Sequence, residues 1–317
     1  MNQSVMAPTE TGGPAQTRGR SATHGARSHR RWSKVRDFHE LGKPGLARFT
    51  VLTTLAGYYL ASVGPLDYVR LVHLAIGSGL AASGTLALNQ YWERDVDARM
   101  RRTRGRPIPS GRILPSEALA FSIVTSAAGL LYLARLVNPM SSLLVAATLV
   151  SYIFIYTPLK RRTTLSTLVG AIPGALPILA GWAAADAPFD ATAWTLFWIL
   201  FLWQPPHFLS LAWLYRDDYR SGGFAMLSVF DPDGGHTGRQ ATLYALTLVP
   251  VSLLPTLLGL TGGIYFFGAL VLGLAFAGLG AAMMIRRTER HARLLFFGSI
   301  IYLPTLLILM VVDKTPG

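Results

Sequence analysis

Residues 294–312 read LLFFGSIIYLPTLLILMVV, an apolar run without a single charged side chain. A helix needs about 20 such residues to cross a hydrocarbon core roughly 30 Å thick. Similar runs recur along the 317-residue chain. The expected spans are 46–63, 68–91, 115–135, 139–157, 165–183, 191–214, 240–260, 263–285 and 294–312. Because lipid offers no partner to unpaired backbone groups, these runs predict an all-α, polytopic membrane bundle of about nine transmembrane helices.

The composition agrees with a membrane protein. Hydrophobic residues make up 51% of the chain and charged residues only 14%, against roughly 25% in ordinary soluble domains. The alternating pattern of about ten residues that is typical of a membrane β-barrel is missing from the sequence. The sequence contains no cysteine, which excludes disulfides, thiolate metal sites and the thioether attachment of c-type haem.

The basic residues lie mainly on one side of the expected bundle. The chain has 29 Lys and Arg and a net charge of +13, which by itself would be compatible with a nucleic-acid partner. With a cytoplasmic N-terminus, 26 of them fall in the tail through Arg48 and in loops 93–112, 158–164, 215–240 and 286–293. The opposite side receives Arg70, Arg135 and Lys314. This positive-inside pattern predicts a cytoplasmic N-terminus and argues against nucleic-acid binding.

The first 44 residues differ from the rest of the chain. They are rich in Arg, Ser, Thr, Gly and Pro, and they contain no apolar stretch typical of a secretory signal. We expect residues 1–44 to be a disordered basic cytoplasmic tail and residues 45–317 to form the membrane domain. A mitochondrial transit peptide has a similar composition, so the mitochondrial inner membrane is the alternative to the preferred bacterial plasma membrane.

Two long cytoplasmic loops, 92–114 and 215–239, hold seven of the 16 acids. At the start of the first loop, Asn89, Glu93 and Asp97 are four residues apart, so a helix would place them on one stripe about 12 Å long. Hard oxygen ligands on one face are what Mg²⁺ needs to hold a diphosphate. Asp95 points away from the stripe and is expected to orient a ligand or pair with an Arg. The alternative for the stripe is an ordinary polar helix end with i,i+4 pairs.

A basic cluster follows the acids directly. It comprises Arg101, Arg102, Arg104, Arg106 and Arg112, and a second group, Lys160-Arg161-Arg162, follows the fourth span. Arginine forks beside a metal site suit a polyanion such as diphosphate. The alternative is that these charges only set the membrane topology.

The second loop is preceded by Trp203-Gln204-Pro205-Pro206-His207-Phe208 and begins with Arg216-Asp217-Asp218. Two prolines in an apolar span are expected to break the helix, and broken membrane helices usually line a cavity. His207 would face that cavity. It is either a structural hydrogen-bonding group, an iron ligand or a group that transfers a proton.

These motifs together resemble the UbiA-type intramembrane prenyltransferases, and within them the branch that farnesylates haem b. The resemblance covers the chain after about residue 44. Its motifs are the acidic stretch, the basic loop that follows it, the segment at the end of the fourth span and the segment before the second loop: Asn89 to Asp97; Met100, Arg101, Thr103, Arg106, Pro107 and Ser110-Gly111-Arg112; Tyr156-Thr157 and Leu159-Lys160-Arg161; and Trp203-Gln204-x-Pro206-His207-Phe208. Gln90 and Glu93 stand where the quinone-type members carry Asp, and Asp217-Asp218 lacks the full second Asp-rich motif.

The resemblance implies a Mg²⁺-dependent transfer of farnesyl from farnesyl diphosphate to a haem b vinyl group, with water addition, to give haem O. It implies that Asn89, Glu93, Asp97, Asp217 and Asp218 hold metal, with Asn89, Glu93, Asp97 and His207 catalytic. Arg101, Arg102, Arg106, Lys160 and Arg161 would bind diphosphate, and Trp203, His207 and Phe208 would contact haem.

The implied partners downstream are haem A synthase or terminal oxidase assembly. An aromatic prenyltransferase of quinone biosynthesis is the alternative enzyme, and an ion-coupled transporter is the alternative from another class. Transport is disfavoured because the acids lie with the basic cluster at one membrane face.

Overall fold

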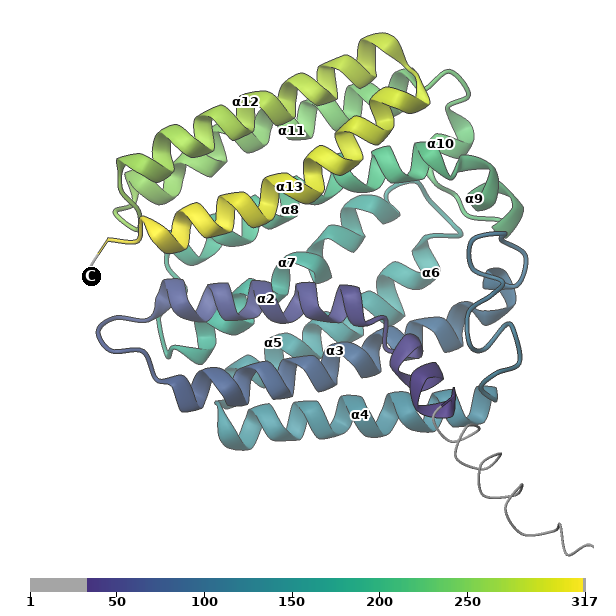
Figure 1. Cartoon of the computed structure of the whole chain (residues 1–317), viewed down its shortest axis with the longest axis horizontal. Coiled ribbons are helices and arrows are strands. Elements are labelled where there is room, and N and C mark those ends of the chain that lie inside the picture. Colours follow the sequence, from purple (N-terminus) through teal and green to yellow (C-terminus); the bar gives the residue numbers. More distant parts are fainter. Residues whose placement is uncertain (1–32, 316–317) are drawn as a thin grey trace, which may run out of the picture.

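The computed structural model describes residues 33–315, and within that range it is built from helices, with a single isolated β-bridge between Thr261 and Lys314. Figure 1 shows long helices lying side by side. In chain order they are α2 (Pro44–Ala61), α3 (Tyr68–Asp97), α4 (Pro115–Leu136), α5 (Pro139–Val150), η1 (Ser151–Tyr156), α6 (Thr157–Leu159), α7 (Ser166–Ala184), α8 (Ala191–Leu214), α9 (Arg216–Gly222), α10 (Leu227–Phe230), α11 (Gly235–Leu257), α12 (Gly263–Arg286) and α13 (Glu289–Val312).

Each expected span is helical, with α5, η1 and α6 together forming the fourth. Seven helices of the described part are long and apolar enough to cross a membrane. The other two expected spans coincide with α2 and α8. Some ends differ from expectation: α3 continues past residue 91 to Asp97, and α11 begins at Gly235 instead of at residue 240.

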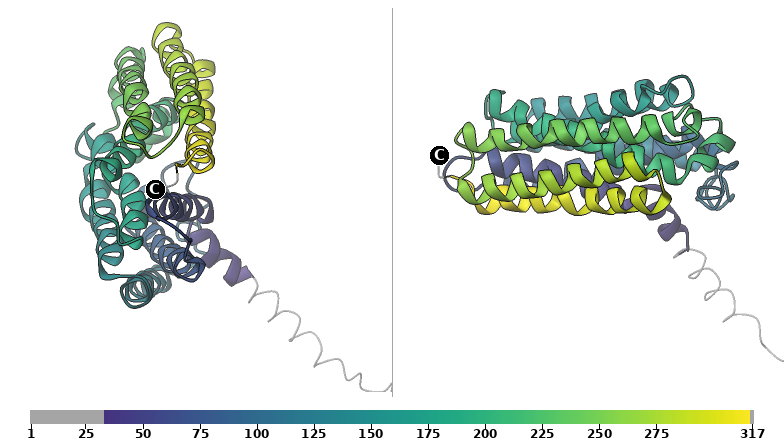
Figure 2. Two further views of the ribbon diagram at one scale, coloured as in Figure 1. Left: turned by 90° about the vertical axis from the view of Figure 1, so that its left-hand side faces the viewer. Right: turned by 90° about the horizontal axis from the view of Figure 1, so that it is seen from above.

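The early helices and the late helices form two groups that α7 and α8 join. Helix α7 packs against α2 and α5 on one side and against α8 on the other, while α8 packs against α11 and α13. The end-on view shows the two groups on either side of this connection (Figure 2, left). Helix α13 also contacts α2, so the first and last long helices lie next to each other.

The charged loops gather at one end of the bundle. In Figure 1 the segment after α3, together with α6, α9 and α10, lies at the right-hand end, and the C-terminus lies at the opposite end. This arrangement agrees with the expected separation of basic loops from the C-terminus. The site described below lies at the end where the loops gather.

Close packing of α2 against α7 depends on two glycines. A Cβ atom added to Gly181 would lie 1.8 Å from the Thr54 carbonyl oxygen, and one added to Gly57 would lie 2.1 Å from the Ile178 carbonyl oxygen. In lipid, where helices gain little from burying apolar surface against each other, such close backbone contact is a main source of association.

The expected tail, residues 1–44, divides at residue 33. Residues 1–32 lie outside the described residues, whereas residues 33–41 form a helix that packs against the loop after α3. Arg112 binds Asp37 and donates to both carboxylate oxygens of Glu40 at 2.7 and 2.9 Å. Gln90 donates to the Leu41 carbonyl at 2.8 Å. The membrane domain therefore includes this helix.

We expect Gly181→Ala to destabilise the protein by about 1–3 kcal/mol, because the new methyl group meets backbone that cannot move aside. Thermal unfolding in detergent measures the effect. Gly278→Ala is the control, since a Cβ atom there meets open space and should leave stability unchanged. Equal losses in the two variants would contradict the importance of the α2–α7 contact.

Candidate active site

The last turns of α3 carry the acidic stripe, and the expectation that Asn89, Glu93 and Asp97 share one face is confirmed. All three are buried, with relative exposures of 1%, 7% and 0%. They therefore belong to a helix end that enters the protein interior. Asp95 points away, as expected: its side chain is 78% exposed and lies 3.8 Å from the Arg94 guanidinium.

Three cations from separate segments contact the stripe. Lys160 Nζ lies 2.8 Å from Glu93 Oε1, and the Arg106 guanidinium lies 2.6 Å from Asp97 Oδ2. Lys43 Nζ donates to Asn89 Oδ1 at 2.9 Å. Burial of acids at a membrane edge is costly without such partners. The acids and cations predicted from the sequence are thus brought together, with Lys43 in addition.

Lys43 is the site residue that the sequence analysis missed, because it was assigned to the tail. It precedes α2 with φ 46° and ψ 67°, in the left-handed region that residues with a Cβ atom rarely adopt. Such backbone strain clusters at functional sites. Burial, and then the Arg106 guanidinium, lower the pKa of Lys43 to about 7. The one signal in the sequence is a lysine next to proline directly before the first span.

Lys160 follows the π-helix η1, which the sequence analysis also did not predict. Its ammonium lies 4.5 Å from the centre of the Tyr156 ring and 6.0 Å from that of Tyr152. Although burial acts to lower the pKa of Lys160, the Glu93 carboxylate raises it above its ordinary value, so the side chain stays charged. Single turns of π-helix are frequent at functional sites because the extra residue redirects the side chains that follow.

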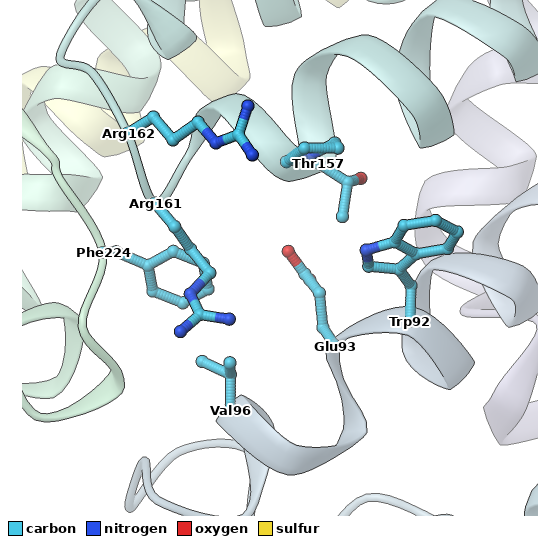
Figure 3. Close-up of a pocket in the computed structure, with 8 residues that line it drawn as sticks. Trp92, Glu93, Val96, Thr157, Arg161, Arg162 and Phe224 are labelled. Atoms are coloured by element: carbon cyan, nitrogen blue, oxygen red, sulfur yellow. The ribbon is translucent and has the colours of Figure 1, made fainter.

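An open pocket of about 490 Å³ lies beside Glu93. It is lined by Trp92, Glu93, Val96, Thr157, Pro158, Arg161, Arg162 and Phe224. Figure 3 shows the side chains of Arg161 and Arg162 on the side of the pocket opposite Trp92, with Glu93 between them. Two exposed guanidinium groups line the pocket, and the buried Lys160 ammonium binds Glu93 of its wall, which gives this pocket the charge to bind a polyanion.

The other arginines predicted to bind diphosphate are placed differently. Arg101 is exposed on the loop after α3. The Arg102 guanidinium lies over the rings of Tyr215 and Tyr219, at 5.2 and 5.9 Å from their centres. Arg106 is the one that reaches the acidic stripe. The five predicted cations are therefore divided between the pocket, the stripe and the outer loop surface.

Asp217 and Asp218 do not join the acidic stripe in one metal site. Asp217 is 80% exposed and pairs with Arg220 at 3.1 Å, whereas Asp218 accepts a bond from the Arg102 backbone N–H at 3.2 Å. Within residues 33–315 no three His, Cys, Asp or Glu side chains are grouped as metal ligands. The structure thus brings the two loops into contact but does not assemble the five predicted ligands.

The stripe alone nevertheless has the chemistry to hold Mg²⁺. It offers two carboxylates and one amide oxygen on one helix face, which suits an ion that takes one or two carboxylates and keeps waters or phosphate oxygens. Asp97 Oδ1 is buried and has no hydrogen-bond partner among the described residues. An unpaired buried carboxylate oxygen is costly, and a cation or its water would satisfy it.

A second, mainly apolar cavity of about 540 Å³ lies inside the bundle. Trp203, His207 and Phe208, the residues predicted to contact haem, all line it. Tyr152 and Tyr156 line it as well, so the cavity reaches the residues that surround Lys160. The predicted break in this span is wrong: α8 runs unbroken through Pro205 and Pro206, because a helix in a bundle can keep its course after losing two backbone donors.

Comparisons with known proteins agree on one family. The model of the UbiA prenyltransferase family matches residues 50–301. A protoheme IX farnesyltransferase of Solibacter usitatus is 47% identical over 292 residues, covering 89% of this chain and 100% of that protein. The protein of the same name from Aquifex aeolicus is 39% identical, covering 88% and 95%.

Solved structures show the same fold. A digeranylgeranylglyceryl phosphate synthase superposes with a TM-score of 0.74 at 17% identity, covering 88% of this chain and 98% of that one. A UbiA homologue from Archaeoglobus fulgidus, bound to GPP and Mg²⁺, superposes with a TM-score of 0.64 at 14% identity, covering 87% and 99%.

We expect Lys160→Met to lower the free energy of unfolding by about 3–5 kcal/mol, because Glu93 would lose the cation that neutralises it inside the protein. Adding Glu93→Gln should restore part of the loss. Unfolding in detergent measures both variants. Arg293→Met is the control, since its 3.8 Å pair with Glu289 is exposed and should contribute less than about 1 kcal/mol. If the double variant were no more stable than the single one, the pair would not carry the effect.

Proposed function

The chain belongs to the UbiA prenyltransferase family, and we propose that it transfers the farnesyl group of farnesyl diphosphate to a vinyl group of haem b, giving haem O and diphosphate. The observation that carries the proposal is the 47% identity over the whole length of a protoheme IX farnesyltransferase. The geometry supports it, because Lys160 links a cation-rich pocket with an apolar cavity: it pairs with Glu93 of the pocket and lies over the ring of Tyr156, which lines the cavity.

The cations of the site bind the diphosphate in this proposal. Arg161 and Arg162 line the open pocket, and Lys160, Lys43 and Arg106 contact the stripe beside it. Lys160 and Arg106 pair with carboxylates in the present structure. The same pairs keep the two cations in place beside the proposed binding position of the phosphate oxygens. Their charges stabilise the leaving group as the bond between the allylic C1 and its oxygen breaks.

Asn89, Glu93 and Asp97 are the residues that would hold Mg²⁺. The ion would supply further positive charge to the departing diphosphate. Lys160 pairs with Glu93, which lines the pocket, and Arg106 pairs with Asp97 one turn further along the helix. Asp217 and Asp218 remain proposed ligands only for a rearranged second loop, since Asp217 pairs with Arg220 in this structure.

In this proposal, the apolar cavity holds the farnesyl chain and the haem while the new carbon–carbon bond forms. Its walls take up the farnesyl chain and exclude stray water while C1 is electrophilic. The haem vinyl group attacks C1, forming a carbon–carbon bond as diphosphate leaves. Water then adds to the vinyl-derived cation and releases one proton, which gives the hydroxyethylfarnesyl side chain. Trp203, His207 and Phe208 lie where the haem would enter.

The protein is an integral membrane protein, and we propose the bacterial plasma membrane with a cytoplasmic N-terminus. The support is the charge distribution. The loop after α3, with six arginines, and the segment around α6, with Lys160, Arg161 and Arg162, are rich in basic residues and lie together at one end of the bundle (Figure 1). The diphosphate pocket would then open toward the cytoplasm.

The proposed reaction is tested with purified protein in nanodiscs, supplied with haem b, farnesyl diphosphate and Mg²⁺. Pigment extraction and mass spectrometry should show haem O, with diphosphate released in equal amount. EDTA should stop both, and Mg²⁺ should restore them. No haem O, or no diphosphate release at all, would reject the proposal.

We expect Asp97→Asn and Glu93→Gln each to lower kcat by on the order of a hundredfold or more, the scale for removing a group that stabilises transition-state charge. Circular dichroism and membrane insertion should stay normal. Asp95→Asn is the matched control: it lies on the same turn, is 78% exposed and should retain activity close to wild type. Near-normal haem O output from both stripe variants would reject the metal assignment.

A further inference from the structure

Ser299 on α13 forms two hydrogen bonds with one face of α8. Its backbone carbonyl accepts from Trp203 Nε1 at 2.8 Å, and its hydroxyl lies 2.7 Å from His207 Nδ1. Trp203 and His207 are four residues apart, so both face the same side of α8. Ser299 is fully buried, its contact with Trp203 is buried, and its contact with His207 is partly buried.

The hydroxyl of Ser299 also donates to the Phe296 carbonyl oxygen at 2.5 Å. Two oxygen atoms approach this closely only when a proton lies between them, so the single hydroxyl proton is directed at Phe296. The hydroxyl oxygen must then accept from His207, which places the proton of the imidazole on Nδ1. The other ring nitrogen, Nε2, keeps its lone pair.

Aromatic rings fix the orientation of this imidazole. Trp203 stacks on His207 with centroids 5.1 Å apart, and Phe296 stacks on it with centroids 5.0 Å apart. His207 lines the apolar cavity, and with both neighbours stacked and Nδ1 engaged, Nε2 is the ring nitrogen left to meet a ligand there.

On the basis of the proposed function, we propose that His207 ligates the iron of bound haem through Nε2 and that Ser299 is the positioning residue that holds the ring in the required tautomer. Histidines that bind metals almost always donate their other ring N–H to a second group, which sets the tautomer and the ring direction. Here the chain runs from Nδ1–H to the Ser299 hydroxyl and on to the Phe296 carbonyl. Iron coordination would hold one face of the porphyrin against α8 and α13.

A proton-transfer role fits this environment less well. A histidine that acts as a base becomes positively charged, and such residues are usually supported by a carboxylate on the other nitrogen. The partner of His207 Nδ1 is instead a neutral hydroxyl. A cation inside the membrane is costly without a counter-ion, whereas a ligand stays neutral.

Titration of ferric haem b into the purified protein, followed by the Soret band and by electron paramagnetic resonance, tests the proposal. Wild-type protein should show a nitrogen-ligated iron. His207→Ala should lose that signature, and added imidazole should restore it. Ser299→Ala should keep the fold but weaken haem binding by about 10- to 100-fold, the usual effect of removing a partner of a metal-ligating histidine.

Ser252→Ala is the matched control. The Ser252 hydroxyl also donates to the carbonyl three residues earlier, and its own carbonyl also accepts from an aromatic side chain, Tyr265. It lies on α11, which does not line the cavity, so haem binding should be unchanged. If Ser252→Ala lowered the haem affinity as much as Ser299→Ala, the effect would come from the general loss of a buried serine. That result would overturn the inference.

The outcomes separate this inference from the proposed function. If His207→Ala bound haem with an unchanged spectrum and affinity, the iron-ligand role would be overturned, whether turnover then stalled or continued. If wild-type protein failed both to bind haem and to make haem O, the proposed function itself would fail. If wild-type protein made haem O but showed no nitrogen ligand, only the present inference would fail.

Discussion

Mutual neutralisation of buried acids and cations is the constraint on which the site depends. The stripe on α3 enters a region with little water, so Asn89, Glu93 and Asp97 each need a polar partner. The partners come from the start of α2, from the loop after α3 and from the end of α6. These contacts tie three separate segments to one helix end, and they place positive charge beside negative charge in the position where an anionic substrate with a metal ion would bind.

The open pocket and the apolar cavity match the two chemically different parts of the proposed substrate. Farnesyl diphosphate has a charged head and an apolar tail, and the structure offers a basic pocket at one end of the bundle and an apolar cavity within it. Tyr152 and Tyr156 separate the two regions, because they line the apolar cavity while their rings lie near the Lys160 ammonium. The π-helix that carries these tyrosines therefore lies at the boundary where the reacting carbon would be placed.

Periodicity and hydropathy predicted the spans and the acidic stripe well, because both depend on residues close together in sequence. The pairing of the stripe with Lys43, Arg106 and Lys160 was only partly predictable, since it depends on which loops meet in space. Lys43 was not predicted as a site residue because the composition of residues 1–44 is typical of a disordered tail. In the structure, residues 33–41 form a helix that Arg112 binds through Glu40. Ser299 carried no signal at all: an isolated serine in an apolar run becomes informative only when His207 is seen beside it.

The order of synthesis gives the Glu93–Lys160 pair a further consequence. The two residues are 67 positions apart, and two expected spans separate them. At about 5–20 residues per second, roughly 3–13 s pass between their emergence from the ribosome. During that interval Glu93 lacks its cation partner. The pair can form only after the two intervening spans have been made, so completion of the site depends on their synthesis and insertion.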